Sequence, residues 1–97
     1  IADGILRARY RESLSNPSLM IPGESYEFTI DLWATSHVFL LGHRLRVEIS
    51  SSNFPRFDRN LNTGGDQATG TQFQTAQQTV LHKGKFRSHI LLPVIPS

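Results

Sequence analysis

"SYEFTIDLWA", residues 25–34, alternates polar and apolar side chains more regularly than any other stretch of this 97-residue chain. The apolar side chains recur at every second position, at Tyr26, Phe28, Ile30 and Leu32. Successive side chains of a β-strand point to opposite faces, so this period predicts a strand with one buried face. Trp33 falls on the polar side of the alternation, which indicates that the second face is covered too.

A second strand of the same kind is predicted at residues 44–52, "RLRVEISSS". Its apolar residues, Leu45, Val47 and Ile49, share one face, and charged residues occupy the other. Weaker patterns predict three more strands, at residues 4–10, 71–82 and 88–97. Pro93 and Pro96 make the last of them short, because proline cannot donate to a sheet ladder. Strands without helices predict an all-β sandwich or barrel.

Glycine and proline mark the connections between these strands. Residues 13–24 are rich in Ser, Pro and Asn and end in a turn at Pro22-Gly23. Further turns are predicted at Gly42 and at residues 83–85, "KGK", whereas residues 64–70, "GGDQATG", predict a flexible segment.

Length and composition fit one globular domain, with 38% apolar and 19% charged residues. The chain has no cysteine, which excludes disulfides and thiolate metal sites within it. No apolar run approaches the roughly 20 residues of a membrane-spanning helix. Net charge is +2, and no motif typical of nucleic-acid binding accompanies the ten basic residues. We therefore expect neither a membrane nor a nucleic acid as a partner.

Motifs that carry chemistry are missing. No Gly-x-Ser-x-Gly elbow presents a serine nucleophile, and no Ser-x-x-Lys pair occurs. A phosphate loop is not indicated, because Thr71-Gln72 follows Gly70 where Lys-Ser/Thr is needed. None of the four histidines has the His-Glu-x-x-His spacing of a zinc site: His37, His43, His82 and His89. We predict no catalytic residue, no metal and no cofactor in residues 1–97.

Residues 51–64, "SSNFPRFDRNLNTG", do not alternate and place Phe54 and Phe57 in a loop. Exposed rings gain nothing from water, so a loop with paired aromatics is expected to touch something apolar.

This loop belongs to a long stretch that resembles a known family. The chain is similar to the C-terminal non-catalytic domain of the X-prolyl dipeptidyl-peptidase and cocaine-esterase (CocE/NonD) group of serine hydrolases. The resemblance is carried by three segments: "GILRARYR" (4–11), "PGESYEFTIDLWATSHVFLLGHRLRVEISSSNFPRFDRNLNTG" (22–64) and "SHILLPVIP" (88–96).

The resemblance implies a jelly-roll β-sandwich of the galactose-binding-like type, of which residues 1–97 are the C-terminal part. In this family the domain follows an α/β-hydrolase domain that carries the Ser-Asp-His triad. No triad residue of the family therefore maps onto this chain. Family members cleave esters or amides, and the module is expected to pack on the catalytic domain and help to shape its active-site region.

The resemblance also suggests what the aromatic loop touches. We expect its side chains to contact the catalytic domain as a polar-rimmed aromatic anchor, formed by Phe54, Arg56, Phe57, Asp58, Arg59 and Asn60. The alternative is that the two rings tuck under their own loop and form a small satellite core.

Two other functions remain open at this point. One is a carbohydrate-binding module, although Trp33, the sole tryptophan, lies in a patterned strand rather than on an obvious sugar-binding face. The other is an autonomous small hydrolase, which would need the missing nucleophile elbow. A jelly roll uses about eight strands and only five are predicted, so we expect self-association or assembly with the rest of the domain.

Overall fold

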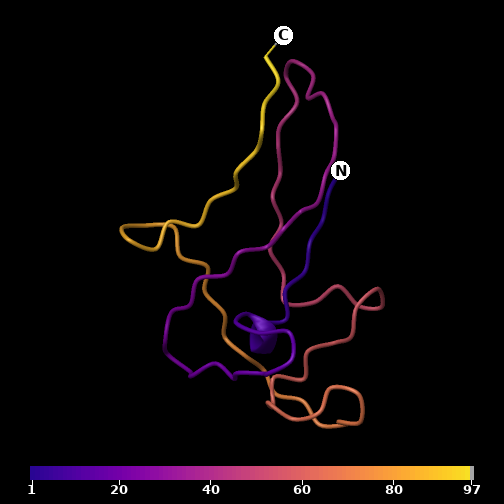
Figure 1. Cartoon of the computed structure of the whole chain (residues 1–97), viewed down its shortest axis with the longest axis vertical. Helices are drawn as coiled ribbons and strands as arrows, with labels where there is room; N and C mark the ends of the chain where they lie inside the picture. Colours follow the sequence, from indigo (N-terminus) through magenta and orange to yellow (C-terminus); the bar gives the residue numbers. More distant parts are fainter. Residues whose placement is uncertain (97) are drawn as a thin grey trace. The chain divides into compact units, whose positions relative to one another are not determined.

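A computed structural model describes residues 1–96 of the chain. The chain divides into two compact units, Ile1–Ser51 and Ser52–Ser97, which are described separately. The regular secondary structure of these described residues is one short 3₁₀ helix, η1 (Ala8–Tyr10), drawn in indigo in Figure 1. No strand forms within residues 1–96, and the jelly-roll sandwich stays a prediction.

The helix η1 occupies the end of the segment predicted as a strand over residues 4–10. Tyr10 N donates to Arg7 O at 2.9 Å and Arg11 N donates to Ala8 O at 3.2 Å, the i to i+3 spacing of a 3₁₀ turn. The beginning of the same segment runs close to another predicted strand. A side chain at Gly4 would collide with the backbone carbonyl of Asp31, so these two backbones lie against each other.

Two predicted turns of the first unit are confirmed, and each depends on a glycine. Glu24 N donates to Ile21 O at 3.2 Å across Pro22-Gly23, and His43 N donates to Leu40 O at 3.0 Å. Gly23 and Gly42, each the third residue of its turn, have φ of 85°. A positive φ at this position defines a type II turn and favours glycine. Figure 1 shows the chain running up to the Gly42 turn and back.

The predicted turn at residues 83–85 is also confirmed, in the second unit. Phe86 N donates to Lys83 O at 3.2 Å, and Gly84, the second residue of this turn, has φ of 61°. A positive φ at that position is typical of the turns that join antiparallel strands. Ser88 N donates to Leu81 O at 3.1 Å, which continues the same two-residue hairpin register away from the turn.

Residues 64–70, predicted as a flexible segment, contain a hydrogen-bonded turn. Gly70 N donates to Asp66 O at 3.0 Å, and the Asp66 carboxylate accepts from Ala68 N at 2.8 Å and from Thr69 Oγ1 at 3.1 Å. A Cβ at Gly70 would lie 2.6 Å from Asp66 O, so the turn closes tightly on this glycine. The Asp66 side chain stabilises this turn, because an aspartate can bond to backbone groups two residues ahead.

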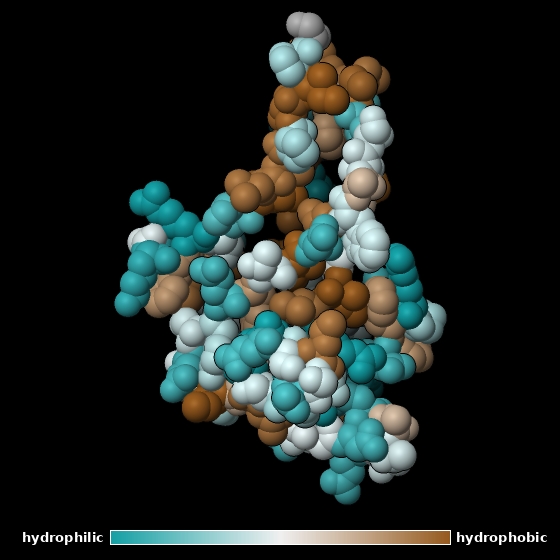
Figure 2. All heavy atoms as spheres, viewed as in Figure 1, coloured by the Kyte–Doolittle hydropathy of each residue, from teal (hydrophilic) through white to brown (hydrophobic). Residues whose placement is uncertain are grey.

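Apolar side chains remain largely open in both units. No side chain within residues 1–96 is buried, and the brown atoms in Figure 2 reach the surface. The accessible surface is 9568 Å², against roughly 5,600 Å² for a folded monomer of the same mass. Much apolar surface is therefore available for contact with other protein.

Candidate interdomain surface

The aromatic loop of the second unit is organised around a tight backbone turn. Phe57 N donates to Asn53 O at 3.0 Å, so the chain folds back around Phe54, Pro55 and Arg56, with a cis peptide between the first two. Phe57 is half-buried, whereas Phe54 is 70% exposed. The two rings are close together in the sequence, but they have different surroundings.

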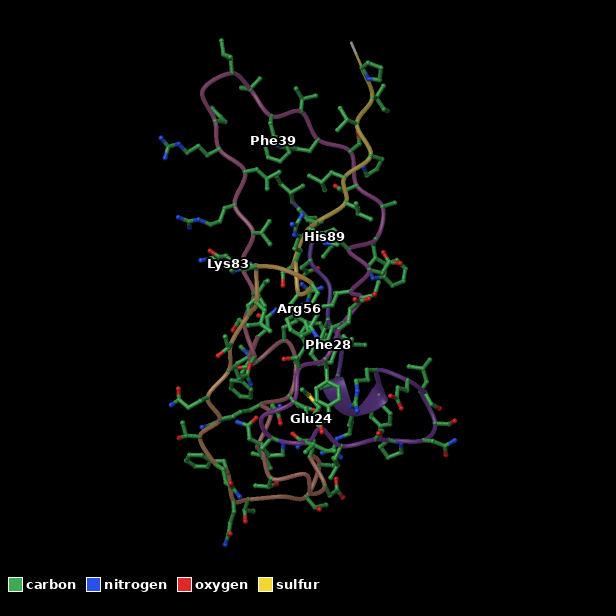
Figure 3. All side chains as sticks on the ribbon, turned by 90° about the vertical axis from the view of Figure 1, so that its left-hand side faces the viewer. Glu24, Phe28, Phe39, Arg56, Lys83 and His89 are labelled. Carbon is green, nitrogen blue, oxygen red and sulfur yellow. The ribbon has the colours of Figure 1, made fainter. Side chains whose placement is uncertain are left out.

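Two arginines of the loop lie over aromatic rings of the same unit. The guanidinium carbon of Arg56, labelled in Figure 3, is 5.3 Å from the centroid of the Phe57 ring. That of Arg59 is 4.3 Å from the centroid of Phe73. Cation–π contacts of this kind contribute about 0.5–1 kcal/mol at exposed sites. The arginines thus cover part of each ring.

Asparagine side chains close the base of the loop. Asn60 Oδ1 accepts from Asn62 N at 3.0 Å, and Asn62 Nδ2 donates to Gln74 O at 3.0 Å. Beside them Gln74 N donates to Leu61 O at 2.9 Å, so residues 61 and 74 lie side by side. Asn62 has φ of 59°, a conformation that asparagine tolerates better than most residues.

Of the six residues expected at the interdomain contact, the structure pairs two with each other, whereas two more contact residues outside the set. Arg56 contacts Phe57, Arg59 contacts Phe73, and Asn60 bonds to the residue two ahead. Asp58 is exposed. Sequence reasoning missed Phe73, although it is the sole aromatic residue of the segment 71–82 and could have been noticed for that reason.

The histidines and acidic residues of the described chain are the candidate ligands for a shared metal site. Within residues 1–96, no three His, Asp or Glu side chains gather as metal ligands would. His37 packs edge-on against the Phe39 ring at 5.0 Å, and His89 Nδ1 lies 2.8 Å from Arg87 O. The same residues contain no helix with the length and apolar character to span a membrane.

Trp33 belongs to the first unit. Its backbone has φ of 63°, and its amide donates to Asp31 Oδ1 at 2.7 Å, so the chain bends where the alternating pattern predicts a straight strand. Trp33 is 84% exposed. The aspartate-centred bend explains the departure from the pattern, because short polar side chains can bond to backbone groups two residues on.

Comparison with known proteins agrees with the resemblance seen in the residues. The family described as the X-Pro dipeptidyl-peptidase C-terminal non-catalytic domain matches residues 1–91. A cocaine esterase from Rhodococcus sp. (strain MB1 Bresler) is 53% identical over 98 residues, which cover 98% of this chain and 17% of that protein. No solved structure matches the chain. The chain belongs to the X-Pro dipeptidyl-peptidase C-terminal non-catalytic domain family, in its CocE/NonD branch.

Proposed function

We propose that this chain is a β-sandwich domain of a serine hydrolase, where it packs on the α/β-hydrolase domain and helps to shape the active-site region. Its family is named as non-catalytic, and the relative, a cocaine esterase, is far longer than the matched region. The whole protein would then cleave esters or amides, with its nucleophile outside residues 1–97.

The observation that carries the packing role is the exposure of Phe54. Its ring is 70% exposed while the neighbouring Phe57 is half-covered, although both belong to one tightly turned loop. A satellite core would cover both rings. An ordered loop that covers one ring and presents the other is instead suited to insert that second ring into a partner.

The surroundings of Phe54 suit such an insertion. Arg56 and Arg59 belong to the same loop as Phe54, and their guanidinium groups lie over the rings of Phe57 and Phe73. Arginine and aromatic residues are enriched at protein interfaces, since the guanidinium can bond to carboxylates and carbonyls at the rim while the ring fills an apolar pocket. Because the loop is already folded, less conformational entropy is lost on docking.

The test compares Phe54→Ala with Phe86→Ala in the full-length protein. Phe86 is a matched control, because it is an exposed ring of the same unit with a cation, Lys85 Nζ, 5.1 Å from its centroid. If Phe54 is docked, its truncation should lower the free energy of unfolding by about 3–5 kcal/mol. Truncation of a solvated ring should change this free energy by less than about 0.5 kcal/mol.

We expect Phe54→Ala to lower the melting temperature and kcat/KM for an ester substrate, and Phe86→Ala to change neither. If both variants have equal and negligible effects, Phe54 does not make the proposed contact. The isolated chain should hydrolyse nitrophenyl acetate and Gly-Pro-nitroanilide only at the buffer rate. Saturable hydrolysis abolished by one Ser→Ala substitution would place the catalytic function in this chain instead.

The exposed Trp33 favours a second candidate, a carbohydrate-binding module. Sugar-binding domains use the flat face of an aromatic side chain, and this indole is 84% exposed. A glycan array probed with the chain and with its Trp33→Ala variant decides between them. Binding that disappears in the variant supports this candidate, and no binding by either leaves the packing role.

A further inference from the structure

Residues 9–18 form a closed loop in the first unit. Ser18 N donates to Arg9 O at 2.7 Å and brings the two ends together. Within the loop, Ser13 Oγ accepts from Ser15 N at 3.3 Å and from Asn16 N at 3.1 Å. A compact segment of this length, with close ends and internal bonds from its own side chains, is an Ω-loop.

One side chain joins this loop to the segments before and after it. Arg11 Nη1 donates to Ala8 O at 2.9 Å and to Ser18 O at 2.6 Å, and its guanidinium carbon lies 4.6 Å from the centroid of the Tyr26 ring. A weaker bond runs from Nη2 to Leu19 O at 3.5 Å. A single guanidinium thus holds the helix η1, the end of the loop and the start of the predicted strand.

Tyr26 extends the same network to the neighbouring turn. Its hydroxyl accepts from Ile21 N at 2.9 Å and donates to Glu24 Oε2 at 3.2 Å, which connects both sides of the Pro22-Gly23 turn. The half-buried residues of the first unit gather mainly in this region: Leu6, Ala8, Arg9, Tyr10, Arg11, Ser13, Ser18, Tyr26 and Leu32.

We infer that Arg11 is a clasp that keeps residues 8–26 ordered as a local element, independently of what covers the rest of the domain. The bonds of the Arg11 and Tyr26 side chains join residues within this range, so the closure that they provide is local. The clasp also gives a fixed position to the loop tip, where Leu14 is 90% exposed.

Arginine is required for this role by geometry as well as by charge. Its planar group donates in several fixed directions while its face lies on a ring, and a lysine ammonium cannot do both. Arg11→Lys keeps the charge and removes this geometry. Arg46→Lys is the matched control, because Arg46 is exposed and its Nη1 lies 3.4 Å from Oε1 of Glu48, two residues away.

The experiment is peptide-resolved amide hydrogen exchange on the full-length protein. We expect Arg11→Lys to speed exchange of a peptide covering residues 9–21 about tenfold or more, because bonds to a charged group contribute about 1.5–3 kcal/mol. The peptide covering residues 81–88 should be unchanged, and Arg46→Lys should match the wild type throughout.

Tyr26→Phe removes the hydroxyl and keeps the ring, so it distinguishes the contributions of the two groups. This variant should speed exchange at Ile21, which loses its acceptor, and leave Ser18 protected, because the ring still supports Arg11. Wild-type protection of residues 9–21 in Arg11→Lys would overturn the inference. Faster exchange over the whole domain in that variant would overturn it too, since the clasp acts locally.

Discussion

Among residues 1–96, the guanidinium groups of Arg11, Arg56 and Arg59 lie over aromatic rings. Each ring belongs to a segment that carries part of the proposed function or the proposed clasp. The composition anticipates this use of arginine in one respect, since eight of the ten Lys and Arg residues are Arg, which stacks on rings better than lysine does. The identity of each ring partner depends on how the chain turns.

Phe57→Ala in the full-length protein tests the covered ring of the aromatic loop. Phe57 is half-buried and Arg56 lies over it, so truncation should remove packing and one cation–π contact. We expect a loss of about 1–3 kcal/mol in stability, measured by thermal or urea unfolding.

Arg56→Lys is the control for the charge at this ring. Its free energy of unfolding should fall by at most about 1 kcal/mol. An unchanged midpoint for Phe57→Ala would mean that the ring contributes nothing to the folded protein, and the division between a covered and a presented ring would fail.

At the scale of elements, the turns are the best-defined features of the chain. The glycines at positions 23, 42 and 84 all have the positive φ that their turns require. The sequence predicted all three turns, because the steric freedom of a single glycine decides the backbone geometry there. The strand predictions are different, because a strand also needs hydrogen bonds to a neighbouring strand.

Gly42→Ala tests one of these turns. A Cβ at Gly42 meets no atom within 4 Å, so the change isolates the cost of a positive φ. Left-handed backbone costs an ordinary residue about 1–2 kcal/mol, and we expect unfolding of the full-length protein to shift by that amount.

Gly65→Ala is the matched control for the turn. Gly65 has no positive φ, and its Cβ would contact Thr63 Oγ1 at 3.4 Å, so this variant should leave stability nearly unchanged. Equal unfolding midpoints for both variants would show that the Gly42 turn does not persist in solution.

At the scale of the whole molecule, the open apolar surface governs behaviour in solution. The chain exposes roughly 4,000 Å² more surface than a folded monomer of its size. Many large hydrophobic side chains of residues 1–96 are exposed, and exposed apolar surface promotes association. We expect the isolated 97-residue chain to form oligomers and to bind a hydrophobic dye, measured by light scattering and fluorescence. A monodisperse species of 10.9 kDa that unfolds cooperatively and binds no dye would contradict this expectation.

The sequence by itself determined the family, the three glycine turns and the loop that carries the candidate surface. These follow from residue identity at particular positions. A turn needs the steric freedom of one residue, and a family is recognised from the residues at many positions along the chain. Within that loop, the expected residue set could be named from the sequence, yet its internal pairing could not.

Only the tertiary structure decided that Phe54 is presented while Phe57 is covered, and that Arg11 joins residues 8, 18 and 26. The physical reason is the same for both. Burial and guanidinium contacts depend on the distance between side chains from separate parts of the chain, and that distance is set by the path of the backbone between them. A local pattern of residues contains no information on that path beyond its own few residues.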